Sequence, residues 1–122
     1  MKVYLSGGMK SGWQDRVKAR CPNIDFIDPR AHGLNDPNQY TLWDLLGVSV
    51  CDILFAYMED DNPSGFGLTF EVGYAKALRK RIVLVDEQMH RHMAIVRASA
   101  DVVLSSLDEG IELLCSLNLL YE

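Results

Sequence analysis

The chain has 122 residues, of which 48% are hydrophobic and 24% are charged, and its formal net charge is −5. That length and apolar content predict one compact domain over residues 1–122, without room for a second core. The acidic balance, with no block of lysine and arginine, argues against a nucleic-acid polymer as partner, because phosphate binding needs clustered basic residues. We therefore expect a small-molecule ligand.

No segment of the sequence approaches the roughly 20 apolar residues that span a bilayer. The first residues enter an apolar run at once, without the charged leader of a secretory signal. We expect a soluble cytoplasmic protein without a membrane partner. Cys21, Cys51 and Cys115 lack the spacing of a zinc site or a disulfide framework, so we expect reduced and mostly buried thiols.

Strands and helices are expected to alternate along the chain. In chain order the predicted elements are a strand over 3–6, a helix from 11 to a point before 22, a strand over 24–27, a helix over about 38–50, a strand over 53–57, a helix over 68–80, a strand over 81–85, a helix over about 90–97, a strand over 101–104 and a helix over 107–117.

Two kinds of signal define these elements. The strands are short apolar runs bounded by glycine, proline and other turn-forming residues. Apolar residues recur at helical spacing between positions 42 and 48, which places Asp44 in the middle of a helix. The first helix must end before Pro22, because proline cannot continue a helix and restricts the residue before it.

This alternation predicts an α/β fold. Strands that are apolar on both faces are typical of a parallel sheet with helices on either side. We expect a single flavodoxin-like, Rossmann-like domain with a five-stranded parallel sheet in the order 2-1-3-4-5. Ligands of such sheets bind outside the carboxyl ends of the strands, where the strand order reverses, so we expect the site among loops 7–12, 28–38 and 59–67.

The first of these loops carries Gly7, Gly8 and Gly12 between a strand and a helix. Exposed backbone N–H groups and the helix dipole favour an anion there, so a phosphate or a sugar hydroxyl could bind. The loop matches neither the dinucleotide fingerprint nor the triphosphate-binding motif, and it is equally compatible with a plain tight turn.

Glu71 follows a Gly-rich loop early in a predicted helix, among apolar and aromatic neighbours. Its carboxylate is expected at the crevice, either as a structural cap or ion pair, or as a nucleophile or base. Asp44 and Asp52 add two acids that we expect near the same mouth, although each could be a helix cap or a surface charge. The pair His90 and His92 does not share a helix face, so we expect no metal site.

An apolar strand, a polar Gly-containing loop and Glu-x-Gly-x-Ala on a helix follow one another in the middle of the chain. They read Asp-Ile-Leu-Phe-Ala-Tyr at 52–57, Pro-Ser-Gly-Phe-Gly-Leu-Thr-Phe at 63–70 and Glu-Val-Gly-Tyr-Ala at 71–75. This series resembles the hallmark of the nucleoside 2-deoxyribosyltransferase superfamily. The resemblance includes Val-Tyr-Leu-Ser-Gly-Gly-Met at 3–9 and the spacing of Asp44 and Asp52, and segments 8–16 and 96–101 are similar to the deoxynucleoside monophosphate N-glycosidase branch.

The resemblance implies a mechanism and a set of site residues. Glu71 would attack the anomeric carbon and form a covalent glycosyl-enzyme, which a base or water then resolves. Asp44 or Asp52 would hold the nucleobase and move its proton, while Tyr4 would position Glu71. Substrate binding is expected at Gly7, Gly8, Met9, Lys10, Gly12, Ser64, Gly65, Gly67, His92 and Met93.

The same resemblance implies that no metal or organic cofactor is required. It also implies a homodimer or higher oligomer with shared active sites, in which the segment around His92 and Met93 contributes across the interface. The expected small-molecule partners are a nucleoside or nucleotide and a nucleobase.

Three functions are compatible with these residues. The first is transfer of 2-deoxyribose between nucleobases, and the second is hydrolysis of a nucleoside 5′-monophosphate by the same nucleophile. The third is a non-catalytic nucleotide-sensing module, since fold does not fix function. Met93 stands where the monophosphate branch has a serine that serves the phosphate, which favours the transferase.

Overall fold

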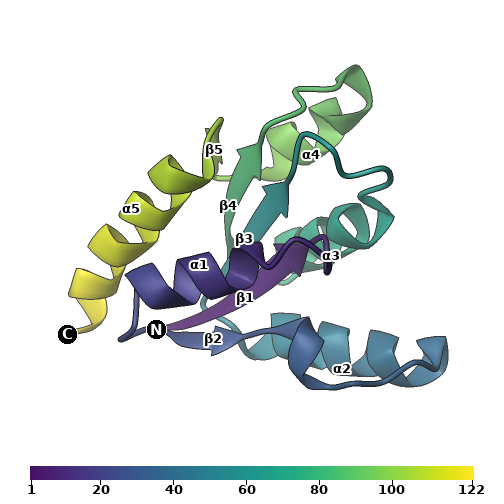
Figure 1. The fold of residues 1–122 in the computed structure, drawn as a ribbon, viewed down its shortest axis with the longest axis horizontal. Helices are drawn as coiled ribbons and strands as arrows, with labels where there is room; N and C mark the ends of the chain where they lie inside the picture. The colour runs from purple at the N-terminus through teal and green to yellow at the C-terminus, as the bar shows by residue number, and fades with distance from the viewer.

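The computed structural model describes residues 1–122 as a central sheet covered by helices on both faces (Figure 1). The strands are β1 (Lys2–Gly7), β2 (Asp25–Ile27), β3 (Ile53–Met58), β4 (Arg81–Asp86) and β5 (Val102–Leu104). The helices are α1 (Trp13–Arg20), α2 (Pro37–Val50), α3 (Phe66–Ala77), α4 (Ala94–Ser99) and α5 (Leu107–Asn118). Short 3-10 helices are η1 (Pro29–Ala31), η2 (Arg91–Met93) and η3 (Leu119–Tyr121).

The sheet is parallel throughout, with the order β2-β1-β3-β4-β5, which confirms the predicted fold class. Strand β1 pairs with β2 on one side and with β3 on the other, in a register that sets Val3 beside Phe26 and Ile53. The order of the strands reverses at this point of the sheet. The loops that follow β1 and β3 therefore diverge and leave a crevice at the carboxyl ends of these strands.

Alternate residues of the central strands enter two separate hydrophobic cores. Phe55 of β3 packs in the core that includes α1 and α5, whereas Leu54 packs in the core that includes α2, α3 and α4. Val83 and Leu84 of β4 divide in the same way. Because both faces of the sheet are covered, these strands are apolar along most of their length, and the charged residues of β4, Arg81 and Asp86, stand at its two ends.

The helix boundaries differ from the predicted ones where the backbone takes a left-handed conformation. Helix α3 begins at Phe66, after Gly65 at φ 75°, a conformation that glycine adopts without steric cost. It ends at Ala77 rather than at residue 80, because Arg79 has φ 60° and leaves the helical path. The helix expected over 90–97 is divided into η2 and the short α4.

Cys21 and Cys115 form a disulfide, so the expectation of three reduced thiols was wrong for this pair. Cys21 directly follows α1 and Cys115 lies in α5, and these two helices pack against each other on one face of the sheet (Figure 1). Their Cα atoms are 5.7 Å apart, within the usual span of a disulfide. Cys51 is free and buried, as expected.

Candidate active site

Glu71 lies in the second turn of α3, with its carboxylate buried against β1. Tyr4 Oη donates to Glu71 Oε2 at 2.5 Å, and Ser6 Oγ donates to Glu71 Oε1 at 2.7 Å. Tyr4 and Ser6 are two residues apart on β1, so their side chains leave the same face of the sheet. The two hydroxyl groups thus hold both oxygens of the carboxylate.

The surroundings of Glu71 tune its protonation. Burial raises the pKa of Glu71 from 4.5 to about 7, the hydrogen bonds from Ser6 and Tyr4 oppose this rise, and the nearby charge of Asp44 adds to it. Burial also raises the pKa of Tyr4 far above its usual range, with the charge of Glu71 as a further cause. The Tyr4 hydroxyl therefore stays protonated and donates, while Glu71 titrates near neutral pH, as suits a nucleophile or a base.

A cavity of about 840 Å³ opens in front of Glu71, at the carboxyl ends of β1 and β3. Its walls come from the glycine turn after β1, the loop between β2 and α2, and the loop between β3 and α3. The glycine turn is anchored by α1, because Trp13 Nε1 and Gln14 Nε2 donate to the carbonyl of Gly8 at 2.8 and 2.9 Å. The cavity has the size of a small-molecule site.

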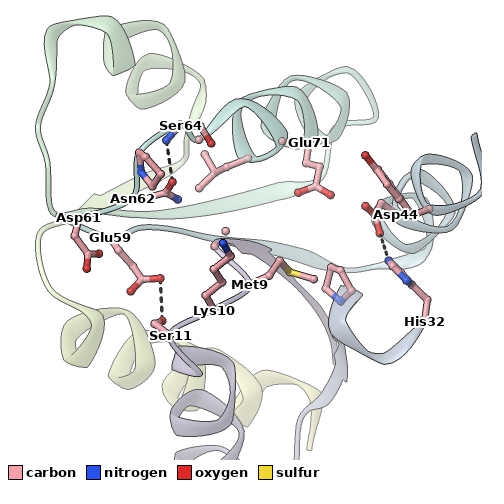
Figure 2. Close-up of a pocket in the computed structure, with 18 of the residues that line it drawn as sticks. Met9, Lys10, Ser11, His32, Asp44, Glu59, Asp61, Asn62, Ser64 and Glu71 are labelled. Atoms are coloured by element: carbon pink, nitrogen blue, oxygen red, sulfur yellow. Dashed lines mark hydrogen bonds and ion pairs between the residues drawn. The ribbon is translucent and has the colours of Figure 1, made fainter. Parts of the chain in front are cut away.

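Figure 2 shows Glu71 between two ends of this cavity that differ in character. Asp44 and His32 form one end, where His32 Nε2 lies 3.5 Å from Asp44 Oδ1. Burial raises the pKa of the Asp44 carboxyl, while contacts with His32 and Tyr4 oppose the rise. This end therefore offers an acid that keeps its proton to higher pH than a free aspartate.

Polar side chains from two loops form the other end of the cavity. Ser11 Oγ donates to Glu59 Oε1 at 2.9 Å, and the Ser64 amide donates to Asn62 Oδ1 at 3.1 Å (Figure 2). Lys10 is the one lysine or arginine that lines the cavity, whereas Glu59 and Asp61 both lie at this end. The local charge is thus negative on balance.

The structure brings most of the predicted site residues together. Those that line the cavity are Gly7, Gly8, Met9, Lys10, Asp44, Ser64, Gly65, Gly67 and Glu71. Tyr4 lies beneath Glu71 and reaches it directly. Gly12 does not line the cavity, because it caps the start of α1 at φ 80°.

Asp52 does not belong to this constellation, and its predicted place in the site was wrong. It precedes β3 at the amino end of the strand, where its Oδ2 accepts the Lys2 amide at 2.7 Å. The carboxyl end of a strand of this length is roughly 20 Å away. The eight-residue spacing of Asp44 and Asp52 was misleading because α2 runs from the crevice, at the carboxyl ends of the strands, back to their amino ends. Asp44 and Asp52 therefore lie far apart.

His92 and Met93 lie outside the cavity of their own chain. Met93 is buried in the core beneath α3, where Thr69 Oγ1 lies 4.0 Å from its Sδ. His92 is exposed beside His90, with ring centroids 4.7 Å apart. Of these two residues, His92 is therefore the one that is free to contact another molecule.

Sequence reasoning did not single out several side chains of the site, among them Ser6, His32 and Glu59. The period of two along a strand carries the signal for Ser6, because a residue two positions after Tyr4 faces the same side. His32 and Glu59 lie in loops 28–38 and 59–67, which were predicted to border the site. Loop side chains have no periodicity, so their direction was not predictable.

No group of three or more histidine, cysteine, aspartate or glutamate side chains is arranged to hold a metal ion. No helix combines the length and the apolar character needed to cross a membrane.

Comparison with known proteins shows similarity at the level of the fold. No family model and no curated protein sequence matches the chain. A 2-deoxyribosyltransferase from Leishmania mexicana has a TM-score of 0.74 at 15% identity, over 94% of this chain and 97% of that one. The 2-deoxyribosyltransferase of Bacillus psychrosaccharolyticus has a TM-score of 0.71 at 17% identity, over 89% of each chain. A CMP N-glycosidase from Clostridium botulinum has a TM-score of 0.67 at 20% identity, over 93% of this chain and 98% of that one.

Proposed function

We propose that this chain is a nucleoside 2-deoxyribosyltransferase that breaks the N-glycosidic bond of a deoxynucleoside and passes the sugar to another nucleobase. The observation that carries the proposal is the buried Glu71 carboxylate, held by Tyr4 and Ser6 and facing the same cavity as Asp44. The shared fold with two 2-deoxyribosyltransferases and an N-glycosidase supports it.

In the first step a Glu71 oxygen attacks C1′ of the sugar while the bond from C1′ to the base nitrogen breaks. The electron pair of that bond stays on the base, which takes a proton from Asp44. The products are a glycosyl ester on Glu71, a free base and an Asp44 carboxylate. A nucleophilic carboxylate and a second acid are the pair that retaining glycosidases use.

In the second step an incoming base attacks C1′ from the face that the first base left. The ester bond to Glu71 breaks, its electrons return to the carboxylate, and the incoming base gives a proton to Asp44. Water in place of the base would yield the free sugar and make the enzyme a hydrolase. Tyr4 and Ser6 stabilise Glu71 as a carboxylate before attack and after release.

The charge of the cavity favours a nucleoside over a nucleoside 5′-monophosphate. In the proposed orientation, with the base at Asp44 and C1′ at Glu71, the 5′ end of the sugar would point toward the end of the cavity that holds Glu59 and Asp61. A phosphate there would meet two carboxylates against the one cation of Lys10, whereas a 5′-hydroxyl can donate to a carboxylate. The monophosphate hydrolase is therefore the second candidate.

The exposed surface supports the proposal of a homodimer or higher oligomer. Leu42, Leu46 and Val50 recur every four residues on α2 and are 60%, 57% and 57% exposed. Phe66 and Phe70 are exposed apolar residues of α3, which packs beside α2, and they are 82% and 58% exposed. Phe66 lies between two glycines of the cavity wall, so a second copy of the chain seated on this face would border the cavity mouth.

Sedimentation velocity tests the assembly. We expect the wild type to sediment as a dimer or larger, and Phe70→Glu to sediment as a monomer, because a charge in an apolar interface is not solvated. Leu120→Glu is the matched control, since Leu120 is 81% exposed on η3, at the opposite end of the molecule. A monomeric wild type would contradict the proposed oligomer.

Product analysis by chromatography tests the function. Deoxyinosine with adenine should yield deoxyadenosine and hypoxanthine, and Glu71→Ala should abolish the exchange. Release of base from deoxynucleoside 5′-monophosphates alone, without exchange, would replace the transferase with the hydrolase. Lack of turnover on all substrates would favour the nucleotide-sensing module instead.

The effect of the negative charge in the cavity can be measured in the same assay. Glu59→Gln removes one negative charge and keeps a hydrogen-bond acceptor at the 5′ end of the sugar. We expect activity on monophosphates relative to nucleosides to rise about 10-fold in this variant, with the nucleoside reaction changed less. An unchanged ratio would show that Glu59 does not exclude phosphate.

A further inference from the structure

His32 is fixed in the loop between β2 and α2 by contacts on each side of its ring. The Leu34 amide donates to His32 Nδ1 at 2.8 Å. The ring stacks with Tyr40 at a centroid distance of 6.4 Å and meets Trp43 edge-on at 5.0 Å. The side chain is 10% exposed. Its orientation is therefore set by the fold before any ligand binds.

The loop that carries His32 is itself anchored. Asp28, at the end of β2, accepts hydrogen bonds from Lys18 Nζ at 2.7 Å and from the backbone and side chain of Arg30. Burial alone would raise the pKa of Asp28, but these hydrogen bonds hold it at about 2. Asp28 is therefore charged at neutral pH, and its contacts fix the start of the loop.

The hydrogen bond from Leu34 determines which ring nitrogen of His32 carries the proton. Because Nδ1 accepts, the proton resides on Nε2, and Nε2 is a donor. This N–H group faces Asp44 Oδ1 at 3.5 Å (Figure 2). Asp44 Oδ1 is buried and has no hydrogen-bond partner, so His32 Nε2 is the donor placed to satisfy it. Such contacts are often long without substrate and tighten in the complex.

We propose that His32 is a positioning residue, whose Nε2–H binds Asp44 Oδ1, directs the proton of Asp44 to Oδ2 and stabilises the carboxylate formed when that proton moves to the leaving base. This inference rests on the proposed function and deepens it. As the bond from C1′ to the base breaks, the Oδ2 proton passes to the base nitrogen, and the negative charge left on Asp44 is shared with Oδ1. A fixed donor at Oδ1 stabilises charge where it develops, which accelerates this step.

The inference predicts a dependence on the leaving group. Deoxyadenosine releases its base readily only if the base is protonated. In 7-methyl-2′-deoxyguanosine the base already carries a positive charge, so it leaves as a neutral molecule without an acid. A defect in Asp44 or in its positioning should therefore slow first-turnover base release from the first substrate and spare that from the second, whereas a general disturbance of the site should slow both.

Two variants of His32 separate its roles. In His32→Asn the side-chain oxygen can still accept the Leu34 amide, but the side chain is too short to reach Asp44. In His32→Gln the amide nitrogen can replace Nε2 as the donor. We expect His32→Asn to lower the first-turnover rate of base release from deoxyadenosine by about 10-fold or more and to change that from 7-methyl-2′-deoxyguanosine less than about 2-fold. His32→Gln should restore part of the loss, and Asp44→Asn should show the same selectivity more strongly.

The pH profile gives a second readout. The groups that face Asp44 are His32 from the loop, Tyr4 from β1 and Glu71 from α3. Without the His32 donor the Asp44 carboxylate is less stabilised, so the alkaline limb of kcat on deoxyadenosine should move to higher pH in His32→Asn.

Equal losses on both substrates, or no loss on either, would overturn this inference and leave the proposed function intact. A wild type that releases no base from either nucleoside would overturn the proposed function, and the inference with it.

Discussion

In the proposed mechanism Glu71 has to be charged to attack, yet the protein buries it, and this conflict would set the pH range of the reaction. Its pKa is raised to about 7, so kcat/KM should fall as the pH decreases below 7 and the carboxylate is protonated. Ser6→Ala removes a hydrogen bond that stabilises the carboxylate, which should raise the pKa of Glu71 further. We expect the acid limb of kcat/KM, measured from pH 5 to 9, to move up by up to about one pH unit. An unmoved limb would contradict this role of Ser6.

The same burial predicts that Glu71 limits stability above neutral pH. In the folded state its pKa lies above the unfolded value of 4.5, so the folded state disfavours its ionisation and loses stability as the pH rises from 4.5 past 7. Glu71→Gln lacks this charge and should raise the free energy of unfolding at pH 8 by up to about 3 kcal/mol. At pH 4 the two proteins should be nearly equal.

Urea unfolding at both pH values measures this difference. Glu112→Gln is the matched control, because Glu112 is exposed on α5 and its replacement should not produce a stability gain that depends on pH. A Glu71→Gln variant that is no more stable than the wild type at pH 8 would show that the carboxylate is solvated.

The residues of the site differed in how far the sequence could predict them. Glu71, Asp44 and Tyr4 were predicted from the family-like motifs, and the structure places them together. The role of Asp52 was inferred from its short separation from Asp44 along the chain. Such an inference fails when a helix and the next strand run in opposite directions. His32 was missed because its direction depends on contacts with Leu34 and Trp43 that no local pattern reveals.

Among the elements, α2 is packed so closely on β1 that it determines the position of Tyr4. A Cβ atom at Gly47 would lie 2.9 Å from Cε2 of the Tyr4 ring and 3.1 Å from Ile27 Cγ2. Gly47→Ala should therefore displace the ring, weaken the hydrogen bond to Glu71 and lower kcat. We expect a loss of about 1–3 kcal/mol in the free energy of unfolding from overpacking.

Gly73→Ala on α3 is the matched control for Gly47→Ala. Apart from its chain neighbours and the backbone of its own helix, no heavy atom lies within 4 Å of a Cβ at Gly73, so alanine should stabilise the helix by about 0.5–1 kcal/mol. Thermal or urea unfolding of both variants gives the comparison. If Gly47→Ala were as stable and as active as the wild type, α2 would not constrain Tyr4.

The elements themselves were predictable because each central strand is apolar on both faces and each loop carries turn-forming residues. The five strands and their order were confirmed, whereas the ends of α3 and the division of the segment before β5 were not foreseen. Those ends depend on single left-handed residues such as Arg79, which apolar periodicity does not report.

At the scale of the whole molecule, the site and the disulfide occupy opposite regions of the same sheet. The site lies at the carboxyl ends of β1 and β3, while Cys21 follows the carboxyl end of α1 and so lies toward the amino ends of the strands. Both combine residues that are distant in the sequence. The family-like motifs located the site, but nothing in the cysteine spacing indicated the pair, because the packing of α1 on α5 brings them together.

The disulfide closes a loop with a sequence separation of 94, so it restricts the unfolded chain strongly. Reduction should lower the free energy of unfolding by about 2–4 kcal/mol, measured by urea unfolding with and without a reductant. Cys115→Ser lacks the disulfide, so its free energy of unfolding should equal that of the reduced wild type both with and without the reductant. Cys51→Ser keeps the disulfide and should respond to the reductant as the wild type does. A wild type that is indifferent to the reductant would show that the bond contributes no stability. Since disulfides are rare in the cytosol, a protein in the predicted cytoplasmic location would work with the stability of the reduced form.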